Sequence, residues 1–188
     1  MSETTTAARR NSSLLVRGAE PADHEAIRGV VLGAYAQYAG QLAPEVFSRY
    51  LAGQLDLGTN ASYGRLLVAG TEDGVRGFAA FYPDASVADS VWPPGWASGR
   101  ALAVHPDARG NGAARALLAT GEYLAIQAGA PVFAFNTHSY MTGAIALYER
   151  LGYRRAPKFD VDLAARFGGP GAAPIMAFAY IRHLTRHT

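Results

Sequence analysis

Two glycines stand where the sequence predicts the start of a helix. In VHPDARGNGAARALL (104–118), Gly110 and Gly112 follow an apolar run typical of a strand, and a helix-forming run begins directly after them. The first turn of a helix presents free N–H groups and the positive end of the helix dipole, which favour an anion, phosphate above all. Glycine lacks a Cβ atom, so a phosphate can approach its main chain, and Arg109 and Arg115 add positive charge on either side. The stretch therefore predicts a backbone site for an anionic ligand.

Three phosphate-binding patterns were compared with this turn. The dinucleotide fingerprint G-x-G-x-x-G fails because Arg115 stands at the last glycine position, and the P-loop G-x-x-x-x-G-K-[ST] fails because no lysine follows. The pattern [Q/R]-x-x-G-x-[G/A] is matched in full by residues 109–114. Taken alone, this short match indicates an ordinary helix-starting turn at least as readily as a binding site.

The elements that must position the turn follow from apolar spacing and turn signals. Strands are expected at 14–20, in a hairpin over 65–83, and at 100–106, 131–138, 153–159 and 174–184. Helices are expected from Pro21 through Tyr35 and over 44–55, 114–129 and 142–152, and loops rich in Pro and Gly at 84–99 and 168–174. This order predicts a mixed α/β sheet with helices on both faces.

The bulk composition excludes several function classes. The 188 residues suit one domain, expected over 14–188, behind a loose polar tail at 1–13. The chain has no cysteine, which excludes disulfides, cysteine metal sites and a cysteine nucleophile, and its net charge of +2 shows no dense basic run for nucleic acid. The histidines lack metal-ligand spacing, so no metal is expected. No apolar signal segment or membrane-length run stands out, so a cytoplasmic protein without a membrane partner is expected.

In its context the turn resembles the GNAT superfamily of acyl-CoA-dependent N-acetyltransferases. The stretch LAVHPDARGNGAARALL (102–118) is similar to the family's acyl-CoA signature, and AIALYERLGY (144–153) is similar to its second signature. The order of elements also matches, from about residue 14 to 183. The resemblance implies a single-domain GNAT-like α/β fold: a mixed, mostly antiparallel central sheet with helices on both faces and splayed fourth and fifth strands.

The resemblance also implies where acetyl-CoA (coenzyme A) binds. The amides of residues 109–114 would cradle the pyrophosphate, and the pantetheine arm would lie between the strands at 102–104 and 132–135, paired with the backbone of the first. Many family members have Asn where Met141 stands, so a polar contact is either missing or supplied by Asn136 or Thr137. The residues implied to bind the cofactor are Leu102, Ala103, Val104, Arg109, Gly110, Asn111, Gly112, Ala113, Ala114, Arg115, Asn136 and Met141.

Acyl transfer to an amine needs a neutral amine, donors for the oxyanion and a proton for the leaving thiolate. Without cysteine, direct attack of the amine on the thioester is the simplest route. Tyr148 matches the family's tyrosine near the CoA sulfur and is expected to be the general acid, although its spacing also fits a core tyrosine. The oxyanion donor would be a backbone N–H in the Ala103–Val104 region.

The general base stays open. Ser98 stands at about the place where many family members carry a Glu. His138 ends its strand and has a suitable unperturbed pKa of about 6.5, but it could equally be a surface-loop histidine. A water chain reaching solvent is another route. Weaker candidates are Asp84, Asp89, Glu45 and Asp160.

The acceptor site in this family draws on the first two helices and the loop before residue 100, which here are aromatic. The residues expected to bind the acceptor are Tyr35, Tyr38, Tyr82, Trp92 and Trp96. The two tryptophans lie in a Pro/Gly loop, which favours a surface flap suited to an apolar or aromatic amine, or to a cation. Few acidic residues cluster there, which speaks against a polycationic acceptor.

Two functions follow. The first is an N-acetyltransferase that moves an acetyl or acyl group from acetyl-CoA to a primary amine of a small molecule, amino acid or peptide. The second is a non-catalytic acyl-CoA-binding sensor or scaffold of the same fold. The apolar closing strand at 174–184 could pair with a second copy in a homodimer, or could lie inside the sheet.

Overall fold

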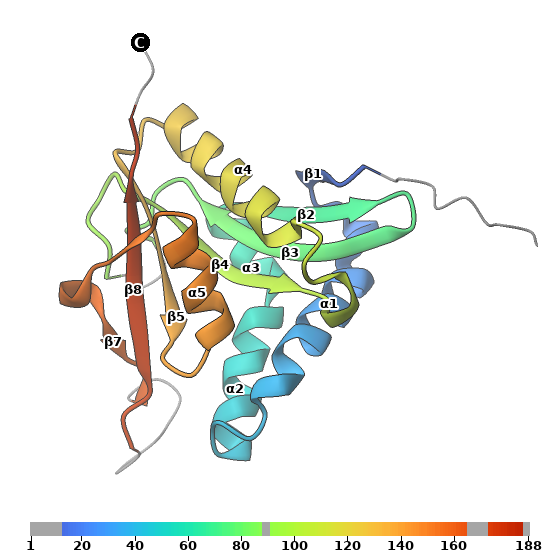
Figure 1. Ribbon diagram of the computed structural model, residues 1–188, viewed down its shortest axis with the longest axis horizontal. Coiled ribbons are helices and arrows are strands. Elements are labelled where there is room, and N and C mark those ends of the chain that lie inside the picture. The colour runs from blue at the N-terminus through green and yellow to red at the C-terminus, as the bar shows by residue number, and fades with distance from the viewer. Residues whose placement is uncertain (1–12, 88–90, 165–172, 186–188) are drawn as a thin grey trace, which may run out of the picture.

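Figure 1 shows a computed structural model of the chain, which describes residues 13–87, 91–164 and 173–185. Within these ranges the strands form one eight-stranded sheet in the order β1-β2-β3-β4-β5-β8-β6, and β7 pairs with the other end of β8. All pairs are antiparallel except β4 and β5, which run parallel. The strands are β1 (Leu15–Gly18), β2 (Arg65–Thr71), β3 (Gly74–Tyr82), β4 (Ala97–Val104), β5 (Val132–His138), β6 (Arg154–Arg155), β7 (Val161–Asp162) and β8 (Met176–His183).

Helices cover both faces of the sheet, as predicted. Helices α1, α2 and α3 lie on one face and α4 and α5 on the other (Figure 1). The helices are α1 (His24–Tyr35), α2 (Pro44–Leu55), α3 (Leu57–Tyr63), α4 (Ala113–Gln127) and α5 (Thr142–Arg150). Short 3-10 turns lie at Pro21–Asp23, Ala36–Tyr38, Pro106–Ala108 and Pro157–Phe159.

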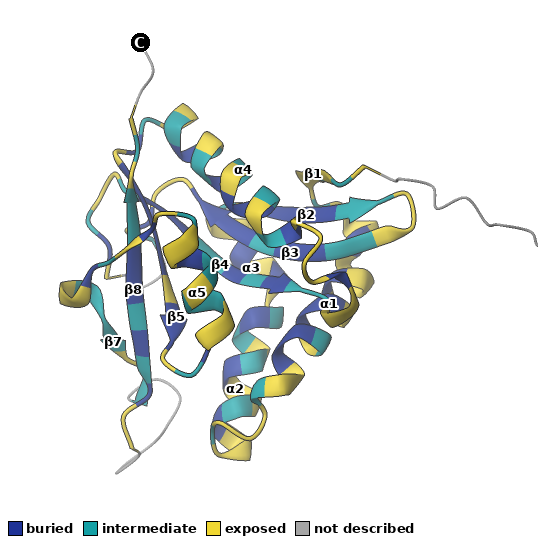
Figure 2. Cartoon of the chain, viewed as in Figure 1, coloured by how far each residue is buried: buried dark blue, intermediate teal, exposed yellow. Residues whose placement is uncertain are grey.

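Each face of the sheet has its own apolar core. Phe78 of β3 packs with Ile27 and Val31 of α1, whereas Phe81 of the same strand packs with Leu117 of α4. Side chains three apart on a strand point to opposite faces, which is why one strand supplies both cores. The buried bands along β2, β3 and β8 in Figure 2 follow from this arrangement.

An ion pair ties β1 to the start of α1. The Arg17 guanidinium donates to both carboxylate oxygens of Asp23, at 2.6 and 2.8 Å, and the Glu20 N–H also donates to Asp23, at 2.8 Å. The bond from Arg17 lowers the pKa of Asp23 to about 2. Asp23 thus caps the turn that leads into α1 and holds the helix against the edge strand.

The parallel pair β4–β5 splays, as predicted. Only two residue pairs join these strands, Ala97 with Phe133 and Ser98 with Ala134. Beyond Ser98, β4 stays paired with β3 alone, so one side of its backbone has no strand beside it. An opened sheet edge of this kind offers N–H and C=O groups to a ligand.

A bulge in β4 lies just past the point of splaying. The register with β3 shifts between Phe78, which pairs with Ala103, and Ala80, which pairs with Arg100. Within the bulge, Ala101 has a φ of 54°, a left-handed conformation that alanine rarely adopts. The bulge re-aims the side chains of β4 where it borders the opened edge.

Three details of the fold differ from the sequence prediction. Helix α3, which the prediction lacks, is capped at its start by Asp56, whose carboxylate accepts from the Thr59 N–H at 3.0 Å. Strand β4 begins at Ala97, inside the predicted loop at 84–99. The strand predicted over 153–159 is only two residues long, because Pro157 has no N–H to donate to the ladder and starts a 3-10 turn.

We expect Ala101→Val to lower the free energy of unfolding by about 2 kcal/mol, because a β-branched residue is disfavoured at positive φ. Ala101→Gly should stay within about 0.5 kcal/mol of the parent, since relief of strain offsets the extra freedom of the unfolded chain. Urea unfolding of the three proteins measures both effects. Equal stability of the Val and Gly variants would show that the bulge does not require this conformation.

Candidate active site

A cavity of about 650 Å³ occupies the region where β4 and β5 part. Its walls come from β4, the start of α4, β5, α5, and the ends of α1 and α2. The residues predicted to bind the cofactor or the acceptor all line it except Asn111 and Trp96, and so do Tyr148 and His138. The residues with predicted roles in cofactor binding, catalysis and acceptor binding therefore share one cavity.

The glycine turn forms one wall of this cavity. Gly110 and Gly112 have φ angles of 81° and 86°, and Gly112 is the N-cap of α4, with no side chain capping the helix. A Cβ atom built on either glycine would meet no protein atom within 4 Å. The backbone geometry, rather than protein packing, therefore calls for glycine here, and it leaves the first-turn N–H groups of α4 open to an anion. These features fit a phosphate-bearing ligand.

Arg109 links the turn to the opposite face of the site. Its guanidinium lies 3.4 Å from the Ala34 carbonyl oxygen and 3.5 Å from the Gln37 side-chain oxygen, both near the end of α1. Both the turn and the end of α1 line the cavity. Arg109 thus joins the two walls in addition to supplying positive charge.

Tyr148 belongs to both the core and the cavity. It is only 5% exposed, and its ring centroid lies 4.2 Å from that of Phe135 and 5.8 Å from that of Tyr180. Burial raises the pKa of Tyr148, and the nearby Tyr35 and Tyr38 add to the rise. Burial therefore reinforces the protonated state that a tyrosine hydroxyl already has at neutral pH.

His138 is buried, so the alternative of a surface-loop histidine is wrong. It is 3% exposed, and its ring lies 4.5 Å from that of Tyr50 and 5.0 Å from that of Tyr140, which stacks on it. Burial lowers the pKa of His138 to about 4, instead of the ordinary value near 6.5. The imidazole is neutral at pH 7, and its Nδ1 has no hydrogen-bond partner among the described residues.

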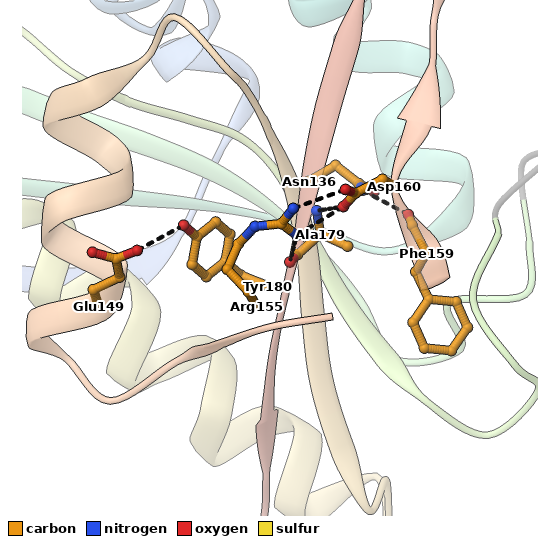
Figure 3. A network of polar contacts seen from close by, with 7 residues as sticks. All are labelled: Asn136, Glu149, Arg155, Phe159, Asp160, Ala179 and Tyr180. Carbon is orange, nitrogen blue, oxygen red and sulfur yellow. Dashed lines mark hydrogen bonds and ion pairs between the residues drawn. The ribbon is translucent and has the colours of Figure 1, made fainter. Parts of the chain in front are cut away.

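The carboxylates considered as bases lie elsewhere. Asp84 accepts from the N–H and hydroxyl of Ser86, at 2.9 and 2.7 Å, and Glu45 is exposed in the first turn of α2. Asp160 accepts two bonds of 2.8 Å from Arg155 and one from the Ala179 N–H (Figure 3). Asp89 lies outside the described residues. In the described part of the chain no Asp or Glu lines the cavity.

The two residues considered for a polar cofactor contact have other partners. The Asn136 amide donates to the Phe159 carbonyl oxygen at 3.3 Å (Figure 3). The Thr137 hydroxyl donates to the Met141 sulfur at 3.6 Å. Both Asn136 and Met141 still line the cavity.

Tyrosines line much of the cavity next to α1 and α2, where the sequence predicts the acceptor to bind. The ring of Tyr35 lies 5.7 Å from that of Tyr50 and 6.2 Å from that of Tyr38, which in turn lies 5.6 Å from Tyr140. The Tyr82 hydroxyl donates to the Asn60 side-chain oxygen. Tyr35, Tyr38, Tyr50 and Tyr82 all line the cavity.

The loop tryptophans do not form a solvent-facing flap. Trp92 is 7% exposed and belongs to a buried cluster with Ala134 and Ala179. Its ring stacks on Trp96 at 6.2 Å, and both pack against Phe159. Trp92 lines the cavity. Trp96 does not line it and packs instead against Trp92 and Phe159.

Sequence reasoning missed Arg100. In a regular strand Arg100 would share a face with Leu102, which packs on the α4 side. The bulge instead puts it on the face of its partner Ala80, together with Ala103, on the side of α1. Arg100 therefore reaches the acceptor side of the cavity.

Comparison with known proteins identifies the family. The acetyltransferase (GNAT) domain family matches residues 62–155, which hold β2 through β6 and thus both sides of the splayed pair. The chain belongs to this family. No curated protein sequence matches the chain.

Solved structures share the fold. The yncA protein of Salmonella typhimurium, solved with its cofactor acetyl-CoA, superposes with a TM-score of 0.60 at 19% identity, covering 93% of this chain and 95% of that one. The PaiA N-acetyltransferase of Thermoplasma acidophilum, solved with coenzyme A, has a TM-score of 0.66 at 14% identity (91% and 99% covered). A GCN5-related N-acetyltransferase of Kribbella flavida has a TM-score of 0.57 at 27% identity (91% and 98% covered).

The described residues show neither a membrane-spanning helix nor a metal-binding cluster. None of their helices is both long and apolar enough to cross a membrane. Nor do they include a group of three or more His, Cys, Asp or Glu side chains that could hold a metal ion.

We expect His138 to make the protein less stable as the pH falls. The unfolded chain binds a proton at His138 near pH 6.5, but the folded chain binds it only near pH 4, so stability is lost between these values. From pH 7 to pH 4.5 the free energy of unfolding should fall by about 2–3 kcal/mol through this group, and His138→Gln should remove that part. Urea unfolding at both pH values measures it.

The pH range stays above the region in which Asp23 titrates, since the pKa of Asp23 lies near 2. His24 is exposed on α1, and His24→Gln serves as the matched control that should keep the parent's pH dependence. If His138→Gln also kept it, the imidazole would not be held neutral by burial.

Proposed function

We propose that the protein is an acetyl-CoA-dependent N-acetyltransferase whose acceptor is the primary amine of a small molecule, and that residues 14–188 form its single domain. One observation carries the proposal: a single cavity joins the glycine turn, the opened edge of β4, Tyr148 and the tyrosines of α1 and α2. Membership of the GNAT family and the neighbours solved with acetyl-CoA and coenzyme A support it.

The chain offers backbone groups for the cofactor at two places. The N–H groups at the start of α4 would hold the pyrophosphate, aided by Arg109 and Arg115. An inner strand directs its N–H groups alternately to its two neighbours, so half of those on β4 beyond Ser98 point toward the gap left by β5. They would pair with the amides of the pantetheine arm.

When bound, acetyl-CoA supplies the thioester whose acyl carbon the amine attacks. A backbone N–H in the Ala103–Val104 region would donate to the developing oxyanion. Tyr148, whose hydroxyl is protonated at neutral pH, would give its proton to the leaving sulfur. The amine loses a proton in the same reaction; His138, neutral and with a free Nδ1, would accept it, or it would pass along water to solvent.

The acceptor side limits the class of amine. Its described walls carry tyrosine, arginine and apolar residues and no carboxylate, which disfavours an acceptor with several positive charges. Trp92 and the tyrosine rings provide apolar surface for the body of a small amine.

We expect Tyr148→Phe to lower kcat for amine acetylation about 10²-fold, since general acid catalysis typically contributes that much. His138→Gln should lower kcat to a similar extent if the imidazole takes the amine proton, and should leave it unchanged if water does. Thiol release from acetyl-CoA across an amine panel measures kcat, and calorimetry should give an unchanged affinity for coenzyme A in both variants. Full activity of Tyr148→Phe would show that the Tyr148 hydroxyl is not the proton donor.

We expect Gly112→Val to weaken binding of coenzyme A at least about 10²-fold, because the side chain would occupy the space above the turn and strain its left-handed backbone. Isothermal titration calorimetry with coenzyme A measures the dissociation constant.

The matched control is Gly152→Val, just after α5. Gly152 has nearly the same φ, 85°, and similarly open surroundings, but does not line the cavity. This variant should lose comparable stability and keep its affinity for coenzyme A. Equal affinities of the two variants for coenzyme A would contradict binding of the pyrophosphate at the glycine turn. Tight binding of coenzyme A without turnover of any amine would favour the non-catalytic acyl-CoA sensor.

A further inference from the structure

Arg100 is a cation on a face of the cavity that holds tyrosines and uncharged polar side chains but no carboxylate among the described residues. It lies on β4 beside the bulge, half-buried, and lines the cavity on the side of α1. Arg100 lies close enough to Tyr82 and Tyr35 for its charge to oppose the rise in pKa that burial causes in both phenols. Arg100 is thus directed at the phenolic cluster rather than at solvent.

No anion balances this charge in the part of the chain that the structure describes. The ion pairs of the described residues involve Arg17, Arg155, Arg182 and His105, but not Arg100. A half-buried guanidinium without a carboxylate loses hydration without regaining an ionic partner. The neighbouring Tyr35 hydroxyl can also donate to an anion.

We propose that Arg100 binds a carboxylate of the acceptor, so that the substrate is an amine that also carries a carboxyl group. A planar guanidinium matches a carboxylate with two parallel hydrogen bonds, and one unpaired cation balances one negative charge. The inference rests on the proposed acetyltransferase function and narrows its substrate class.

The position of Arg100 relative to Tyr148 is consistent with such a substrate. Arg100, Tyr35 and Tyr148 all line the same cavity, and Tyr35 is close enough to affect the pKa of Tyr148 and to be affected by Arg100. Tyr148 is the proposed proton donor at the thioester. An amine that reaches the thioester through this cavity would therefore have Arg100 available to its carboxylate.

The test compares amines that differ only in the carboxyl group. The pairs are phenylalanine with phenethylamine, leucine with isoamylamine, and β-alanine with ethylamine, each acetylated with acetyl-CoA by the parent, Arg100→Gln, Arg100→Lys and Arg28→Gln. Arg28 lies on the exposed side of α1 and away from the cavity, which makes it the matched loss of one positive charge. Affinity for coenzyme A is measured in parallel.

We expect the parent to favour the carboxylate-bearing member of at least one pair by about tenfold or more in kcat/KM, and Arg28→Gln to keep that preference. Arg100→Gln should abolish it by slowing only that member, and Arg100→Lys should restore part of it, because an ammonium cannot form the paired bonds. Coenzyme A affinity should be unchanged throughout.

A parent that favours the uncharged members, or an Arg100→Gln variant that slows both members equally, would overturn the inference while leaving the proposed function standing. Absence of coenzyme A binding, or of turnover with every amine, would instead refute the proposed function and this inference with it.

Discussion

The site depends on the early parting of β4 from β5. Two residue pairs hold these parallel strands together, and beyond Ser98 the backbone of β4 faces a gap in the middle of the sheet. Interior backbone groups are normally paired, so a gap of this kind is stable only where something else can satisfy them. The same separation makes room for the cavity and brings the start of α4 and the side of α5 to a common space. The separation of β4 from β5 therefore shapes both the sheet and the cavity.

The bulge in β4 adds the second constraint. It shifts the register by one residue, holds Ala101 in a left-handed conformation and turns Arg100 onto the face of α1. Strain of this kind persists only where the surrounding structure over-determines it, as it does between two tightly packed cores. The strand thus presents backbone groups on the cofactor side and a cation on the acceptor side.

The described wall of the cavity carries positively charged side chains and no negatively charged ones. Its described walls hold arginines and phenols whose pKa is raised by burial, a histidine whose pKa is lowered by burial, and no carboxylate. Burial disfavours the charged form of each group, so it lowers the pKa of His138 and raises that of Tyr148. Both side chains are therefore uncharged at neutral pH.

The sequence by itself determined the order of the elements, the two-sided covering of the sheet and the glycine turn, because apolar periodicity and positive-φ glycines are local signals. With the family resemblance it also indicated Tyr148 and most of the cavity wall. It could not reveal the short extent of the β4–β5 pairing, the burial of His138 and Trp92, or the direction of Arg100. Those depend on strand register and on contacts between residues far apart in the chain, such as His138 with Tyr50. A one-residue shift in β4 leaves no local trace in the sequence, yet it changes the face on which Arg100 lies. The face on which Arg100 lies therefore follows from strand register in the folded protein, not from its neighbours in the sequence.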